Sequence, residues 1–81
     1  MHSLSLFEFQ QLSLDKQVDL LTAEAQYLAW KSEGEYNVYL YKFEDFFAEA
    51  WMHLRMSRIM RISCSRISSS PEGYDKEIKI S

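Results

Sequence analysis

Glycine, proline and cysteine are scarce in this chain, and each shortage excludes a class of protein. The 81 residues include two glycines, one proline and one cysteine. With only Gly34 and Gly73, a glycine-rich loop that cradles phosphate groups is hard to build. The single Cys64 excludes an internal disulfide framework and a cysteine-rich zinc site. We therefore expect a fold that depends on neither disulfides nor structural zinc.

Motifs of catalysis are also missing. The sequence has no Gly-x-Ser-x-Gly and no His-Glu-x-x-His, which carry nucleophilic and zinc-dependent hydrolysis respectively. His53 and Cys64 could approach each other across a hairpin, but two ligands fall short of a typical zinc site. We expect no enzyme, no cofactor, no metal site and no small-molecule substrate.

Long apolar runs are absent, and the charge is mildly acidic. No stretch approaches the roughly 18 apolar residues that span a bilayer, and the N-terminus lacks the basic region of a signal peptide. The net charge of −3 argues against general nucleic-acid binding, which depends on neutralising phosphates. A content of 47% hydrophobic and 15% aromatic residues is typical of a folded globular domain. We expect a soluble cytoplasmic protein without a membrane segment.

The first half of the chain predicts a helix followed by a strand. Ser13 is a typical N-cap residue. After it, apolar side chains recur at helical spacing and form one stripe: Leu14, Val18, Leu21 and Ala25. The pattern predicts a helix over residues 14–24, preceded by an arm or a short helical turn in residues 1–12. Residues 25–31 alternate as a first strand, and the turn residues at 32–35 follow it.

Residues 36–67 contain three further strand-like runs, at 36–43, 46–52 and 58–64, with a tight turn at Glu44 and Asp45. Residues 45–58 have a rival interpretation as a helix capped by Asp45, because they are rich in good helix formers. The strongest break falls at 68–73. We expect one domain over residues 1–67 and a polar tail over 68–81, either loosely attached or forming an edge strand.

Strand alternation predicts a sheet with two unlike faces. One face is expected to be aliphatic and to receive the helix: Val38, Leu40, Ala48, Ala50, Met52, Met60, Ile62 and Cys64. The other is expected to be aromatic and charged: Tyr39, Tyr41, Phe43, Phe47, Glu49, Trp51, Ile59 and Arg61. The fold class that follows is α+β, with one N-terminal amphipathic helix packed on a three- to four-stranded antiparallel meander.

Part of this pattern resembles a known group of proteins. The residues that carry the resemblance are Leu12 to Lys16, Tyr36-x-Val38-x-Leu40-Tyr41, Phe46 to Trp51, and Ile59-x-x-Ile62. They resemble a group of short uncharacterised bacterial proteins, whose pattern is a helix followed by a meander with an aromatic-x-Glu-x-Trp strand. The resemblance implies the strand interpretation of residues 46–52 and a bacterial origin. It implies no catalytic residues, and this chain departs from the pattern after Met52 and beyond Arg66.

The aromatic face suggests a protein-binding surface, because large aromatic side chains are enriched at interface hot spots. Its candidate contact residues are Tyr39, Tyr41, Phe47, Glu49, Trp51 and Arg61. The chain's own ends, a second copy in a homodimer, or a different protein could cover this face. Glu49 could be a catalytic carboxylate, but a cross-strand ion pair with Arg61 is favoured.

Two other functions stay open. Arg55, Arg58, Arg61 and Arg66, with aromatic residues nearby, suggest a small nucleic-acid-associated regulator. A small inhibitor encoded by a mobile element is a further possibility. The preferred hypothesis is a non-catalytic protein-interaction module, either a homodimer or a binder of another protein.

Overall fold

The computed structural model describes residues 4–68, 71, 73 and 74. Two helices precede four strands: α1 (Leu6–Gln10), α2 (Leu14–Glu24), β1 (Gln26–Glu33), β2 (Tyr36–Lys42), β3 (Phe46–His53) and β4 (Arg58–Arg66). The strands form one antiparallel sheet in the order β1-β2-β3-β4. The α+β class and the four-stranded antiparallel meander are thus confirmed, and the helical interpretation of residues 45–58 is wrong.

The N-terminal residues form the short helix α1, so the structure has two helices. Of the two forms expected for residues 1–12, an arm or a short helical turn, α1 corresponds to the second. Ser5 and Glu8 cap α1 reciprocally, each side chain bonding the other's backbone N–H, which satisfies two of the free donors at a helix start. Ser13 caps α2 by accepting a hydrogen bond from Lys16 N at 3.3 Å. The buried Gln17 donates to Phe9 O at 2.8 Å and so joins the two helices.

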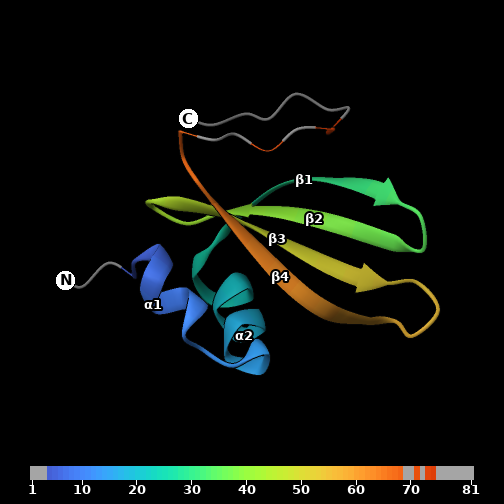
Figure 1. The fold of residues 1–81 in the computed structure, drawn as a ribbon, viewed down its shortest axis with the longest axis horizontal. Helices are drawn as coiled ribbons and strands as arrows, with labels where there is room; N and C mark the ends of the chain where they lie inside the picture. The colour runs from blue at the N-terminus through green and yellow to red at the C-terminus, as the bar shows by residue number, and fades with distance from the viewer. Residues whose placement is uncertain (1–3, 69–70, 72, 75–81) are drawn as a thin grey trace.

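Figure 1 shows both helices on the same side of the sheet. The helices lie on one side, which we call the helix face. Its core contains Phe9, Leu21, Phe43, Phe46, Ala48 and Ala50. Tyr74 contacts Glu49 on the other side, which we call the tail face. The ring of Phe9 from α1 packs against the ring of Phe46 on β3, with centroids 5.4 Å apart.

The register corrects the predicted division of faces. Tyr39 pairs with Ala50, and Leu40 pairs with Glu49, and directly paired residues of antiparallel strands share a face. The tyrosines of β2 therefore lie on the helix face, while Val38 and Leu40 lie on the tail face, the reverse of the expectation. The reason is the two-residue turn of Glu44 and Asp45, which pairs odd-numbered residues of β2 with even-numbered residues of β3.

A bulge corrects the prediction again in β4. Trp51 pairs with Arg61 but Met52 pairs with Ile59, so Met60 is an extra residue in the ladder. A bulge of this kind shifts the alternation by one position. Ile62 and Cys64 lie on the helix face as expected, whereas Ile59 joins them there instead of lying beside Arg61.

The tail prediction falls mainly outside the described residues. Residues 69–70, 72 and 75–81 are not among them. The prediction of a loosely attached tail or an edge strand over 68–81 therefore lies mainly outside the described residues. The domain boundary at residue 67 stays a prediction.

Two phenylalanines of α1 offer a matched test of the core. Phe9 is fully buried and Phe7 is 69% exposed. Phe9→Ala should lower the free energy of unfolding by about 3–5 kcal/mol because it leaves a cavity between the helices and the sheet. Phe7→Ala should change it by less than about 0.5 kcal/mol. Urea denaturation followed by circular dichroism measures both, and equal losses would contradict this placement of α1.

Candidate functional site

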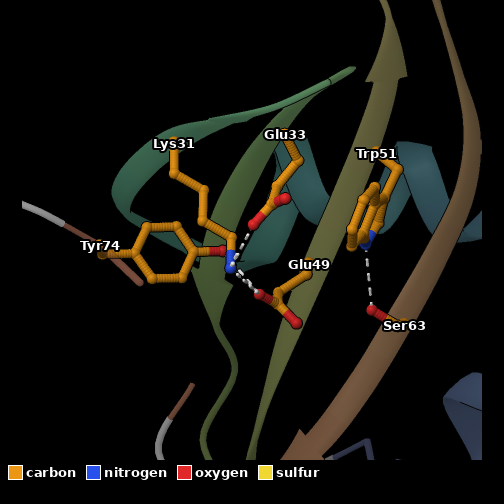
Figure 2. Close-up of polar contacts among 6 residues, drawn as sticks. All are labelled: Lys31, Glu33, Glu49, Trp51, Ser63 and Tyr74. Carbon is orange, nitrogen blue, oxygen red and sulfur yellow. Dashed lines mark hydrogen bonds and ion pairs between the residues drawn. The ribbon is translucent and has the colours of Figure 1, made fainter. Parts of the chain in front are cut away.

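The most connected polar group of the described residues lies on the tail face. Lys31 comes from β1, Glu49 from β3 and Tyr74 from the segment beyond β4, and Figure 2 shows the three side chains converging. Tyr74 Oη donates a hydrogen bond to Glu49 Oε2 at 2.7 Å. Lys31 Nζ lies 4.0 Å from Glu49 Oε2 and 4.7 Å from the centroid of the Tyr74 ring. We call this group the Lys31–Glu49–Tyr74 cluster.

Burial makes these contacts stronger than surface contacts. The side chains of Lys31 and Glu49 are only 16% and 18% exposed. Burial raises the pKa of Tyr74, and the hydrogen bond and charge of Glu49 raise it further, because all three oppose a negative phenolate. The Tyr74 hydroxyl therefore stays protonated and remains a donor to Glu49. The cluster joins residue 74 to β1 and β3.

In this geometry the carboxylate of Glu49 already has a hydrogen-bond donor and a cation as partners. Tyr74 and Lys31 both contact Oε2, and a general base must instead be free to accept a proton from a substrate. Among the described residues, no group of three or more His, Cys, Asp or Glu side chains could hold a metal ion. The chemistry that the cluster supports is attachment of the tail segment to the sheet.

The predicted ion pair between Glu49 and Arg61 is replaced by other contacts. Glu49 pairs in register with Ser63, whereas Arg61 pairs with Trp51. The guanidinium of Arg61 lies over the indole of Trp51, 4.4 Å from its centroid, in a cation–π contact. Trp51 Nε1 donates to Ser63 Oγ at 3.3 Å. The register places Glu49 two pairs away from Arg61, and Lys31 becomes its cationic partner.

The six predicted contact residues do not form one surface. Phe47, Glu49, Trp51 and Arg61 share the tail face, while Tyr39 and Tyr41 lie on the helix face. Phe47 is buried and cannot be a contact residue in this conformation. Tyr39 and Tyr41 instead gather with residues of β1.

An aromatic patch on β1 and β2 contains two residues that sequence-based prediction missed. Its members are Tyr27, Trp30, Tyr39 and Tyr41. The ring centroid of Tyr27 lies 5.5 Å from that of Tyr41 and 6.4 Å from that of Tyr39, and Trp30 pairs with Tyr39. Tyr27 and Trp30 are 49% and 47% exposed. A bulge at Leu28 places both side chains on the helix face, whereas regular alternation would put Tyr27 and Trp30 on opposite faces.

The four arginines of the nucleic-acid hypothesis are dispersed. Arg58 and Arg61 belong to the tail face of β4, Arg66 pairs with Phe46 on the helix face, and Arg55 lies in the loop before β4. None of them forms an ion pair with a carboxylate of the described residues.

His53 and Cys64 lie on opposite faces of the sheet. His53 pairs with Tyr36 on the tail face, and Cys64 pairs with Ala48 on the helix face. His53 Nε2 contacts Glu35 Oε1 at 3.2 Å. Burial raises the pKa of the Cys64 thiol to about 11, so the neutral thiol predominates at neutral pH. These two side chains cannot share a metal ion in this conformation.

Comparison with known proteins gives no relative: no family model, no curated protein and no solved structure matches this chain. The resemblance to short bacterial proteins stays a prediction. Neither α1 nor α2, the helices of the described residues, has the length and apolar character that crossing a membrane requires.

Removal of the Tyr74 hydroxyl tests the cluster. Tyr74→Phe keeps the ring over Lys31 but leaves Glu49 without its donor, so the free energy of unfolding should fall by about 1–2 kcal/mol. Tyr36→Phe is the matched control, because the Tyr36 hydroxyl makes no hydrogen bond to a described residue. Urea denaturation at pH 7 measures the free energy of unfolding of both variants. If Tyr74→Phe were as stable as Tyr36→Phe, the result would contradict the hydrogen bond between Tyr74 and Glu49.

The raised pKa values predict a loss of stability in alkali. The ordinary pKa values are 10.0 for Tyr74 and 9.0 for Cys64, and folding raises both. The folded state thus keeps its protons longer, so this contribution is fully present below pH 9 and is lost as the pH rises toward and beyond 11. The free energy of unfolding should decline from about pH 9 to 11.

The same titration of Tyr74→Phe should show a shallower decline above about pH 10. Tyr27 and Tyr41, whose pKa values burial also raises, still titrate in this variant and keep part of the slope. An unchanged slope would mean that folding does not raise the pKa of Tyr74.

Proposed function

We propose that the protein is a non-catalytic protein-interaction module that contacts its partner through the aromatic patch. The observation that carries the proposal is the exposure of Tyr27 and Trp30, each close to one half, beside two more tyrosines. Tryptophan and tyrosine bury large areas with few rotamers to freeze and dominate interface energies. Exposed aromatic side chains that lie on neighbouring strands of one sheet face are typical of an interaction site.

The rigidity of the hairpin supports the same function. Gly34 has a positive φ of 59°, which the first position of a two-residue hairpin turn requires, and it joins β1 to β2 tightly. Tyr39 Oη accepts a hydrogen bond from Asn37 Nδ2 at 3.3 Å. A partner therefore meets side chains that are already ordered, which lowers the entropic cost of association.

The state of Glu49 supports the non-catalytic part of the proposal. Glu49, the most buried carboxylate of the sheet, already contacts Tyr74 and Lys31, and the four residues of the aromatic patch include no Asp, Glu, His or Lys. A second copy of this chain is one candidate partner and a different protein is another. Nucleic acid is less favoured, because the arginines are divided between the two faces of the sheet.

Photocrosslinking tests the proposed surface. Trp30 is replaced by p-benzoylphenylalanine, and Phe7, an exposed aromatic outside the patch, is replaced in the same way as the matched control. Irradiation in cells of the source organism should give a discrete adduct from position 30 but not from position 7. Its mass distinguishes a second copy from another protein, and irradiation of the purified chain over a range of concentrations checks self-association.

Trp30→Ala tests how much the aromatic patch contributes to the binding affinity. Loss of a central aromatic contact should weaken binding to the captured partner by at least about tenfold while leaving the thermal midpoint nearly unchanged. Position 30 giving no adduct, or no more adduct than position 7, would refute the aromatic patch as the contact surface.

A further inference from the structure

The outer edge of β4 is a second surface, at the opposite end of the sheet from the aromatic patch. β4 is the last strand in the order β1-β2-β3-β4, and Figure 1 shows it as an outer strand that passes beside α2. No strand of the described residues pairs with its outer side. The backbone N–H and C=O groups along such an edge can pair with a strand of another chain.

The two faces of β4 differ in chemistry. Arg58 pairs with His53 and Arg61 pairs with Trp51, which places both arginines on the tail face. Ile59 and Ile62 pair with Met52 and Ala50 on the helix face. The bulge at Met60 produces this sorting, because regular alternation would have put Arg58 and Arg61, three residues apart, on opposite faces.

Each side of β4 offers groups that a partner strand can contact. On the tail face, Arg58 and Arg61 form no ion pair with a described carboxylate. A groove of about 550 Å³ lies between α2 and β4, with an apolar lining of Leu14, Val18, Ile59 and Met60 and a charged lining of Asp15, Asp19 and Arg58. Arg58 therefore borders both the tail face and the groove, whereas Arg61 belongs to the tail face alone.

We propose that the edge of β4 binds an extended segment of a partner protein in which acidic and apolar side chains alternate. The segment adds a fifth strand to the sheet, so that its backbone pairs with β4 and its side chains alternate between the faces. Its acidic side chains lie beside Arg58 and Arg61, and its apolar side chains enter the groove beside Ile59. The proposal rests on protein binding as the function but not on the aromatic patch.

Charge favours this occupant over two others. Antiparallel pairing of two β4 strands about Ile62 would put Arg58 and Arg61 of both copies on the same face of the joined sheet, and β4 contains no carboxylate to pair with them. Nucleic acid would bring phosphates toward Asp15 and Asp19, which line the same groove. An alternating strand directs its acidic side chains to the tail face, where Arg58 and Arg61 lie, and turns only its apolar side chains toward Leu14, Val18 and Ile59 in the groove.

The test uses the full chain and a synthetic peptide. The peptide has about eight residues, the length of β3, and repeats Glu-Val. Titration of ¹⁵N-labelled protein should shift the amide resonances of β4 and of the first turns of α2, with binding that weakens as salt rises. A Lys-Val peptide of the same length, and a peptide with all glutamates before all valines, should bind at least about tenfold more weakly.

Matched charge variants locate the site. Arg58→Gln with Arg61→Gln should weaken peptide binding at least about tenfold, and Arg58→Gln alone, which leaves the Arg61 contact with Trp51 in place, should weaken it severalfold. The control, Arg55→Gln with Arg66→Gln, removes the same total charge from the loop and the other face and should change the affinity by less than about threefold. Circular dichroism verifies that each variant is folded.

Several results would overturn the proposal: no binding of the Glu-Val peptide, shifts centred on β1, equal binding of the Lys-Val peptide, or equal loss in the two double variants. Displacement of the peptide by a thymidine oligonucleotide at lower concentration would also overturn it, in favour of nucleic acid. Peptide binding at β4 without any adduct at Trp30 would refute only the aromatic patch. An adduct at Trp30 without peptide binding would refute only the β4 site.

Discussion

The tight turn between β2 and β3 is the constraint on which the rest of the structure depends. Phe43 N donates to Phe46 O at 2.9 Å, and the two rings stack with centroids 4.8 Å apart. A turn with two central residues sets the pairing of both strands, and a shift of one residue would move every side chain of a strand to the other face. The turn therefore decides that Ala48 and Ala50 meet the helices together with Tyr39 and Tyr41.

Two bulges then adapt this pairing to the outer strands. The bulge at Leu28 brings Tyr27 onto the helix face beside the tyrosines of β2, and the bulge at Met60 brings Arg58 onto the tail face with Arg61. Bulges re-aim side chains at sheet edges, and here each one lies on a strand at the end of the sheet. Both proposed binding surfaces exist because an edge strand departs from regular alternation.

The sequence predicted the local elements well and the faces poorly. Helix caps, turn residues and hydrophobic periodicity are local signals, so the helix beginning after Ser13, the turn at Glu44 and the strand containing Trp51 follow from them. The faces depend on pairing between strands. Counting through the two-residue turn would have corrected β2, but no residue type near Leu28 or Met60 marks a bulge. The contact between Tyr74 and Glu49 joins residues 25 positions apart, and no local pattern predicts it.

The described residues at the centre of the sheet are buried on both faces, which explains why the two proposed binding surfaces lie at its ends. The helices occupy the middle of one face with Phe9 and Leu21, and Tyr74 lies over the other beside Glu49. Val38, Leu40 and Phe47 are buried on that second face, so its centre serves stability. The two proposed surfaces, an aromatic one on β1 and β2 and a charged edge on β4, differ in chemistry. If both bind, they should select different partners, because one offers aromatic contacts and the other a strand edge with arginines.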